Sequence, residues 1–192
     1  ADLVSDQFAG GRRDITNGTV TSGTCCADTA TEFKMMEKLM VDTGKMWVRD
    51  YKISSFRFDI MGAHPLDAML RFRDAVQAIE PSTYIYGEGW NCCGGEDDVR
   101  FKSARQANLA GTGIGSFSDR IRDPVRGGGP FDSGQNHVQN QGFINGWFYA
   151  PNALNTGSAA ERDALITDTD NIRTWLAGGL AGYRFTSATG AV

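Results

Sequence analysis

Hydrophobic residues between positions 29 and 51 recur at the spacing of an α-helix. We expect them to share one face of a helix that ends near Tyr51; they are Phe33, Met36, Met40 and Trp47. Thr29 and Glu32 precede this face with the spacing of a capping box, in which each side chain satisfies a backbone N–H at the helix start. We therefore predict a first helix over about 29–51, with its methionines packed in the core.

The same periodicity predicts two further helices. Pro65 fits the start of one, and the apolar residues after it keep helical spacing until Glu80 and Pro81 end the pattern. Ser158 and Glu161 form a second capping-box pattern, and the helix that they open is expected to run to the glycines near position 178.

Three short aromatic and apolar runs have the character of strands, over 56–62, 84–90 and 113–117. They alternate with helical patterns, the second of which is a polar stretch over 100–108, and this alternation predicts a parallel sheet. Asp59 and Glu88 are 29 residues apart, close to the roughly 31 residues per unit of a 250-residue (β/α)8 barrel. We predict an α/β fold in which this chain carries the middle of a TIM barrel, about strands four to six with their flanking helices.

The segments between these elements resemble connections. Residues 1–28 are rich in Gly, Thr, Asp and Ser without periodicity, and residues 131–157 are rich in Asn, Gln and Gly. We predict one partial barrel domain over 1–192, with 1–28 an irregular loop region that leads into it and 131–157 a long loop.

Composition excludes several classes of protein. Of the 192 residues, 41% are hydrophobic and 22% are charged, which is typical of a globular chain with a sizeable core. The net charge of -4 gives no electrostatic reason to expect nucleic acid or an anionic membrane as partner. No apolar run approaches the roughly 20 residues of a membrane span, and the first residues do not resemble a signal peptide.

The four cysteines form two adjacent pairs, Cys25 with Cys26 and Cys92 with Cys93, and none has the C-x-x-C spacing of a zinc or redox motif. Two interpretations stay open: unpaired thiols, or a disulfide that links one pair to the other in an oxidising compartment. The two histidines, His64 and His137, are too far apart in sequence to suggest a histidine metal site. We predict no catalytic metal.

Two carboxylates stand where α/β barrels place reactive groups, directly after predicted strands. Asp59 and Glu88 are each followed by glycine or small residues, and such a pair can supply the nucleophile and the acid of glycoside cleavage. Arg57 shares a strand face with Asp59 and would keep it ionised. Trp90 offers an aromatic surface for a sugar ring. The alternative is that either acid only caps the following helix.

Several segments of the chain resemble a known family of enzymes. The segments Phe56–Gly62, Tyr86–Trp90 and Gln106–Phe131 are similar to type I pullulanases and limit dextrinases of the α-amylase superfamily, glycoside hydrolase family 13. The segment Thr24–Ala30 resembles a loop of these enzymes ahead of the helix before their fourth barrel strand. The similarity covers nearly the whole chain, and the third segment is specific to the debranching enzymes.

The resemblance implies a retaining hydrolase of α-1,6 branch links in pullulan, starch or glycogen dextrins. It places Asp59 as nucleophile and Glu88 as acid/base, with Arg57, His64 and Trp90 at the substrate. Ser54 and Ser55 replace the family's Asp-Gly, and Ala63 replaces a histidine, so that only the adjacent His64 remains. The family's Asn-His motif and the His-Asp motif that supplies a third carboxylate have no counterpart in this chain.

Three alternatives to a complete catalytic unit are compatible with the residues. The chain could act on α-1,4 links, bind α-glucan without cleaving it, or serve as a structural part of such a barrel. The chemistry requires no cofactor, and a structural calcium ion is compatible with the family although no ligands can be named. The expected partners are an α-glucan and the remaining segments of the same barrel. For a bacterial source we favour a secreted or cell-surface protein whose signal lies outside this chain.

Overall fold

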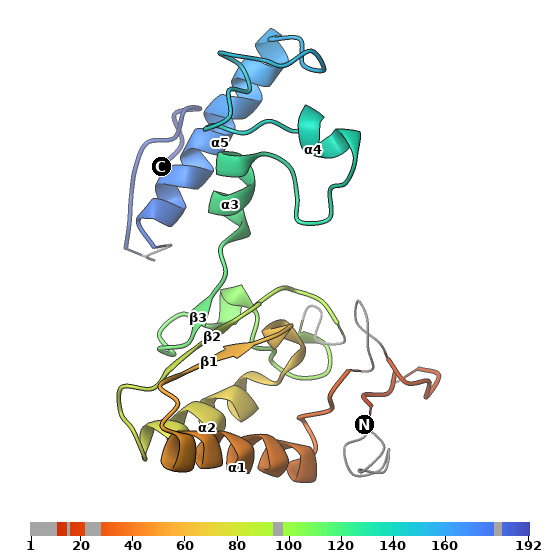
Figure 1. Cartoon of the computed structure of the whole chain (residues 1–192), viewed down its shortest axis with the longest axis vertical. Helices are drawn as coiled ribbons and strands as arrows, with labels where there is room; N and C mark the ends of the chain where they lie inside the picture. The colour runs from red at the N-terminus through yellow and green to blue at the C-terminus, as the bar shows by residue number, and fades with distance from the viewer. Residues whose placement is uncertain (1–10, 15, 22–27, 94–97, 179–181) are drawn as a thin grey trace. The chain divides into compact units, whose positions relative to one another are not determined.

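The computed structural model describes residues 11–14, 16–21, 28–93, 98–178 and 182–192. The chain divides into two compact units, Ala1–Phe117 and Ser118–Val192. Among the described residues, the first unit contains a parallel sheet, two α-helices and short 3-10 turns, and the second contains helices and loops (Figure 1). The α/β class and the parallel sheet predicted from the sequence are confirmed.

The sheet of the first unit has three strands in the order of the chain. They are β1 (Ser55–Phe58), β2 (Tyr84–Gly87) and β3 (Gly115–Ser116), and each neighbouring pair is parallel. Phe58 is the register partner of Gly87, so β1 and β2 end at the same level. Parallel neighbours of this kind are joined by crossover connections and not by tight hairpins.

Two helices pack on each other on one side of this sheet, α1 (Lys34–Tyr51) and α2 (Leu66–Gln77) (Figure 1). The side chains of Met69, Phe72 and Val76 on α2 are buried, as the helical spacing predicted. Gly44 lets α1 approach closely, because a Cβ there would lie 2.3 Å from the ring of Phe72. Ile85 on β2 completes the centre of the core.

The predicted packing of the α1 methionines is only partly found. Met40 borders the core, whereas Met35 is 50% exposed and was predicted wrongly. The exposed face of α1 and the adjacent β1 form an apolar groove of about 590 Å³, whose lining includes Met36, Leu39, Met40, Trp47, Ile53 and Phe56.

The capping box predicted for α1 is wrong. The N-cap is Phe33, and it has no side-chain cap. Glu32 instead accepts two hydrogen bonds from Arg12, at 3.1 Å each. The pairing of Glu32 with a buried guanidinium, 20 residues away in sequence, therefore replaces the local cap.

The predicted strands are too long, and the helix predicted over 100–108 is absent. β1 stops at Phe58 because Ile60 has left-handed backbone angles, φ 44° and ψ 47°. Within the described residues 100–108, where a helix was predicted, only η3 (Gln106–Asn108) is helical, and it is a single 3-10 turn. Asp98 accepts hydrogen bonds from the N–H and hydroxyl of Ser103 and from Asn108, and these hold the chain in a loop.

The second unit consists of α3 (Asp119–Arg126), α4 (Gln135–Gln139) and α5 (Ala159–Leu176), with α3 packed on α5. The capping box of Ser158 and Glu161 at the start of α5 is confirmed in both directions. The region 131–157 is mostly loop, as predicted, but contains α4. No periodicity in the sequence predicted α3, which has Pro124 in its interior.

Candidate active site

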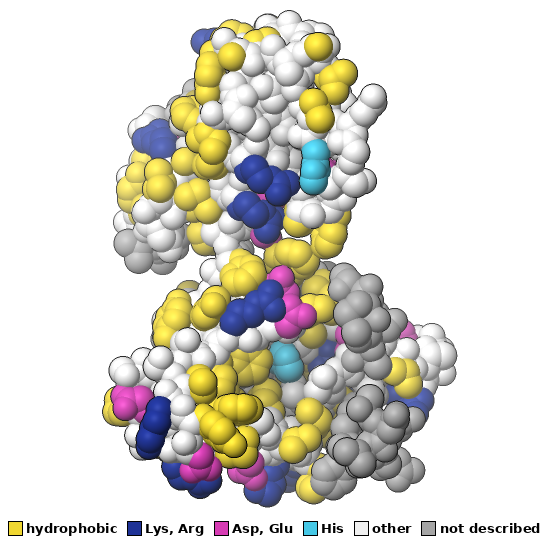
Figure 2. Space-filling model, in the orientation of Figure 1, with side chains coloured by type: hydrophobic (Ala, Val, Ile, Leu, Met, Phe, Trp, Pro, Cys, Tyr) yellow, Lys and Arg dark blue, Asp and Glu magenta, His cyan; other side chains and the backbone are white. Residues whose placement is uncertain are grey.

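Asp59 and Glu88 are the first residues after two neighbouring strands of one parallel sheet. Because Phe58 and Gly87 are register partners, the two acids follow them at the same edge of the sheet. Asp59 is 70% exposed, whereas Glu88 is only 17% exposed. The sequence prediction that both carboxylates follow the carboxyl ends of adjacent strands is confirmed. On the first unit, basic and acidic side chains adjoin at the surface (Figure 2).

Arg57 connects the two carboxylates. Its Nη1 donates to Oδ1 of Asp59, and its Nη2 lies 3.1 Å from Oε1 of Glu88. The guanidinium also lies over the ring of Phe117, 5.2 Å from its centroid, after β3. A planar group that is held by two carboxylates and an aromatic face has little freedom to turn.

These contacts favour the ionised form of Asp59. Hydrogen bonds from Arg57 and then from Glu88 lower the pKa of the Asp59 carboxyl below its ordinary value, against a smaller effect of desolvation. The expectation that Arg57 keeps Asp59 ionised is confirmed in direction. A carboxylate that is ionised and accessible can attack an electrophilic carbon.

Glu88 is held by the backbone of the turn that follows Asp59. Its Oε2 accepts a hydrogen bond from the N–H of Ile60 at 2.9 Å, and its carbonyl accepts one from Gly62 at 2.9 Å. Ile60 itself has left-handed backbone angles, a conformation that costs a β-branched residue about 1–2 kcal/mol. The 3-10 turn η1 (Met61–Ala63) therefore fixes the orientation of the Glu88 carboxylate.

Trp90 lies directly against this turn. A Cβ on Gly62 would stand 1.8 Å from the carbonyl oxygen of Trp90, so only glycine allows the two segments to come this close. The Trp90 residue is partly exposed. Its predicted role as a sugar-binding surface stays a prediction.

His64 follows the same turn. Its Nδ1 lies 2.7 Å from the hydroxyl of Thr31, and its ring meets the ring of Phe58 edge to face. Burial, and then the charge of Arg12, lower the pKa of His64 to about 4, so the imidazole is neutral at pH 7. The structure thus ties one ring nitrogen to the protein itself, and the predicted contact of His64 with substrate stays a prediction.

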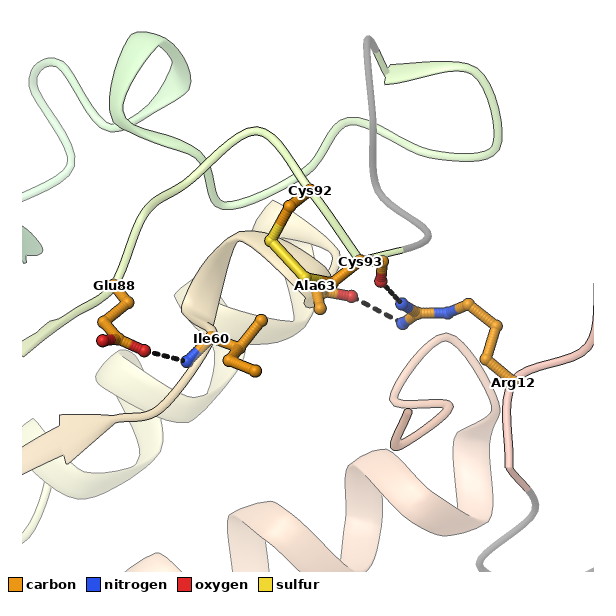
Figure 3. Close-up of a disulfide and its surroundings, with 6 residues drawn as sticks. All are labelled: Arg12, Ile60, Ala63, Glu88, Cys92 and Cys93. Atoms are coloured by element: carbon orange, nitrogen blue, oxygen red, sulfur yellow. Dashed lines mark hydrogen bonds between the residues drawn. A yellow bond between two sulfur atoms is a disulfide. The ribbon is translucent and has the colours of Figure 1, made fainter. Parts of the chain in front are cut away.

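Cys92 and Cys93 form a disulfide with each other (Figure 3). For this pair, both predicted interpretations, unpaired thiols and a disulfide to the other pair, are therefore wrong. The other pair, Cys25 and Cys26, lies outside the described residues. The carbonyl of Cys93 accepts a hydrogen bond from Arg12 at 3.0 Å, and this arginine was also not identified from the sequence. No local pattern marks Arg12, since its partners are up to 81 residues away in the chain.

Within the described ranges, no three His, Cys, Asp or Glu side chains converge so as to hold a metal ion. Among the helices described for this chain, none combines the length and the apolar character needed to cross a bilayer.

Known proteins with similar sequences include several pullulanases. The chain is 46% identical over 181 residues to a pullulanase of Klebsiella aerogenes, and 38% identical over 187 residues to chloroplastic pullulanase 1 of Arabidopsis thaliana. These matches cover 94% and 93% of the chain. The chain belongs to the type I pullulanase family. No protein-family model matches it.

Solved pullulanase structures agree with this assignment. The structure of Klebsiella pneumoniae pullulanase complexed with maltotriose matches 94% of the chain at 46% identity, with a TM-score of 0.83. The chain spans 16% of that structure, and 16% and 19% of the two related sequences. This pullulanase-family chain therefore corresponds to one segment of much longer proteins.

Proposed function

We propose that this chain is the central part of the catalytic barrel of a retaining α-1,6-glucan hydrolase, with Asp59 as nucleophile and Glu88 as acid/base. The observation that carries the proposal is the sharing of one guanidinium, that of Arg57, by two carboxylates at adjacent strand ends. The relationship to pullulanases supports the α-1,6 link of pullulan, starch or glycogen dextrins as the bond that is cut.

The proposed reaction has two steps. Glu88 donates a proton to the glycosidic oxygen while Asp59 attacks the anomeric carbon, so that the C–O bond breaks and a glycosyl ester forms. Glu88, now ionised, takes a proton from water, and the resulting attack releases the sugar and restores Asp59. Arg57 stabilises the charge of Asp59 whenever the ester is absent. No cofactor takes part.

The barrel itself is part of the proposal. Three parallel strands in chain order, and the match to a segment of pullulanase, support a (β/α)8 barrel of which β1, β2 and β3 are strands four to six. The other strands, and the third carboxylate, would come from the rest of a longer protein. Those segments would also cover the apolar groove along α1.

A hybrid enzyme tests this function. In what we call the hybrid pullulanase, the segment of Klebsiella pneumoniae pullulanase that aligns with this chain is replaced by the chain. We expect it to release maltotriose from pullulan, and Asp59→Asn or Glu88→Gln to lower kcat at least about 10³-fold. Asp42→Asn, an exposed acid of α1, is the matched control. A folded hybrid without activity, or an undiminished Asp59→Asn variant, would contradict the assignment.

A further inference from the structure

The side chain of Arg12 is the most deeply buried cation of the described chain, with 1% of its surface exposed. Its Nη1 donates to the carbonyl of Cys93 at 3.0 Å, and its Nη2 donates to the carbonyl of Ala63 at 2.5 Å (Figure 3). Ala63 belongs to the turn after β1, and Cys93 to the loop after β2. One guanidinium therefore joins the two segments that follow the two candidate catalytic carboxylates.

The same guanidinium is fixed from its other side. Glu32 accepts from its Nε and Nη2 at 3.1 Å each, so the two groups form a bidentate pair. The ring of Phe101 lies 5.0 Å from the guanidinium carbon. The backbone of Arg12 is also held, by hydrogen bonds with Thr21 and Asp28. Arg12 is thus a rigid anchor.

The contact with Ala63 bears on the acid/base. Ala63 is the last residue of η1, and the residue before this turn, Ile60, donates the backbone N–H that orients the Glu88 carboxylate. Ile60 holds an unfavourable left-handed conformation, and such conformations persist only where the surroundings impose them. Arg12 adds a side-chain link between the end of this turn and the loop after β2, beside the backbone hydrogen bond from Gly62 to Glu88.

We propose that Arg12 is a positioning residue, which holds the Met61–Ala63 turn against the loop after β2 so that Glu88 is aimed at the scissile oxygen. The inference rests on the proposed function. Lysine cannot replace this arginine, because a single ammonium group cannot serve two carbonyls and both oxygens of Glu32 in one plane. The role assigned to Arg12 is thus to fix the position of the turn, and Arg12 itself does not touch substrate.

A misplaced Glu88 carboxyl group should affect two kinds of substrate to different extents. Pullulan needs a proton on its leaving oxygen, whereas α-maltotriosyl fluoride releases fluoride, which needs little help from an acid. Misplacement of Glu88 should therefore slow pullulan more than the fluoride substrate, while a general loss of folding would slow both equally.

The experiment compares Arg12→Lys with Arg13→Lys in the hybrid pullulanase. Arg13 is the matched control, since it is exposed and donates only to the carbonyl of Gly18 among the described contacts. We expect Arg12→Lys to lower kcat on pullulan roughly 10- to 100-fold, with KM little changed and a several-fold smaller loss on the fluoride. Arg13→Lys should match the parent hybrid on both substrates.

Each outcome decides the matter. A folded Arg12→Lys variant that keeps kcat on pullulan within twofold, or loses both substrates equally, overturns the role of Arg12. Where Arg12→Lys does not fold, Glu32→Gln removes the negative charge that pairs with the guanidinium and leaves Arg12 in place; the same preferential loss on pullulan is expected, and an equal loss overturns the proposal. An inactive parent hybrid instead refutes the proposed function, and the Arg12 assignment falls with it.

Discussion

The Glu88 carboxylate accepts a hydrogen bond from the backbone N–H of Ile60, 28 residues earlier in the chain, at 2.9 Å. The donor stands one residue after Asp59, so the position of one carboxylate is set by the backbone next to the other. The geometry between the two acids therefore depends on the turn between β1 and α2. A separation of about 5–5.5 Å between the carboxyl groups is the value expected for a retaining mechanism.

Replacing Gly62 should disturb this turn. In Gly62→Ala the new Cβ would meet the carbonyl of Trp90 at 1.8 Å, a backbone atom that cannot swing away. We expect a loss of stability of about 2 kcal/mol or more, together with a loss of activity on pullulan in the hybrid pullulanase. The thermal midpoint and kcat provide the measurement.

Gly129→Ala is the matched control for this change. A Cβ at Gly129 would meet no atom within 4 Å, and the position has no positive φ. The control should therefore keep the thermal midpoint and the activity of the parent hybrid. Equal behaviour of the two variants would show that the contact between Gly62 and Trp90 is not tight in solution.

Removing the shared guanidinium should change the pH dependence of activity. Arg57 is the main cause of the lowered pKa of Asp59, so Arg57→Gln should raise that pKa toward its usual value. Activity requires ionised Asp59, and the acid limb of kcat/KM against pH should therefore move to higher pH, with a lower plateau. An acid limb that stays in place would show that another group governs it. Arg49→Gln is the control, because Arg49 forms an exposed ion pair with Asp50 on α1.

The neutral state of His64 predicts a pH-dependent stability. Its pKa is about 4 in the folded chain and about 6.5 when unfolded, so the unfolded state binds the proton more readily. The resulting stabilisation is fully present above pH 6.5 and is lost as the pH falls from 6.5 to 4, by up to about 3 kcal/mol. We expect the difference in thermal midpoint between the hybrid and its His64→Gln variant to shrink across this window. A constant difference would mean that His64 titrates normally.

Local patterns predicted the fold where the stabilising contacts are themselves local. The two residues of the capping box, Ser158 and Glu161, are three positions apart in the chain, and both of its hydrogen bonds form. The spacing of Met69 and Val76 correctly marked the buried face of α2. The carboxylates Asp59 and Glu88 could be found because each directly follows a predicted strand, and the carboxyl ends of parallel strands lie at one edge of a sheet.

Contacts that do not follow the spacing of a helix or a cap could not be predicted in this way. Glu32 has the spacing of a cap, but the guanidinium of Arg12 takes its carboxylate. Asp98 holds Ser103 and Asn108 in a loop where a polar helix was predicted. Arg12 could not be recognised as important, because nothing in a single sequence shows that it meets Ala63 and Cys93.

The apolar groove along α1 predicts how the chain behaves alone. Its lining includes Met36, Trp47 and Phe56, on a helix and on the strand at the edge of the sheet. An apolar surface of this kind, and an edge strand without a partner among the described residues, favour association. We expect the isolated 192 residues to unfold at a lower temperature than the hybrid, or to self-associate, as measured by calorimetry and light scattering.

The isolated chain should also be inactive. Superfamily resemblance calls for a third carboxylate that this chain does not supply, and the loss of one group that stabilises transition-state charge removes orders of magnitude of rate. We therefore expect the isolated chain to release no measurable maltotriose from pullulan under conditions in which the hybrid pullulanase does. Turnover by the isolated chain that disappears in Asp59→Asn would show that two carboxylates and one arginine suffice, and the requirement for the rest of the barrel would have to be abandoned.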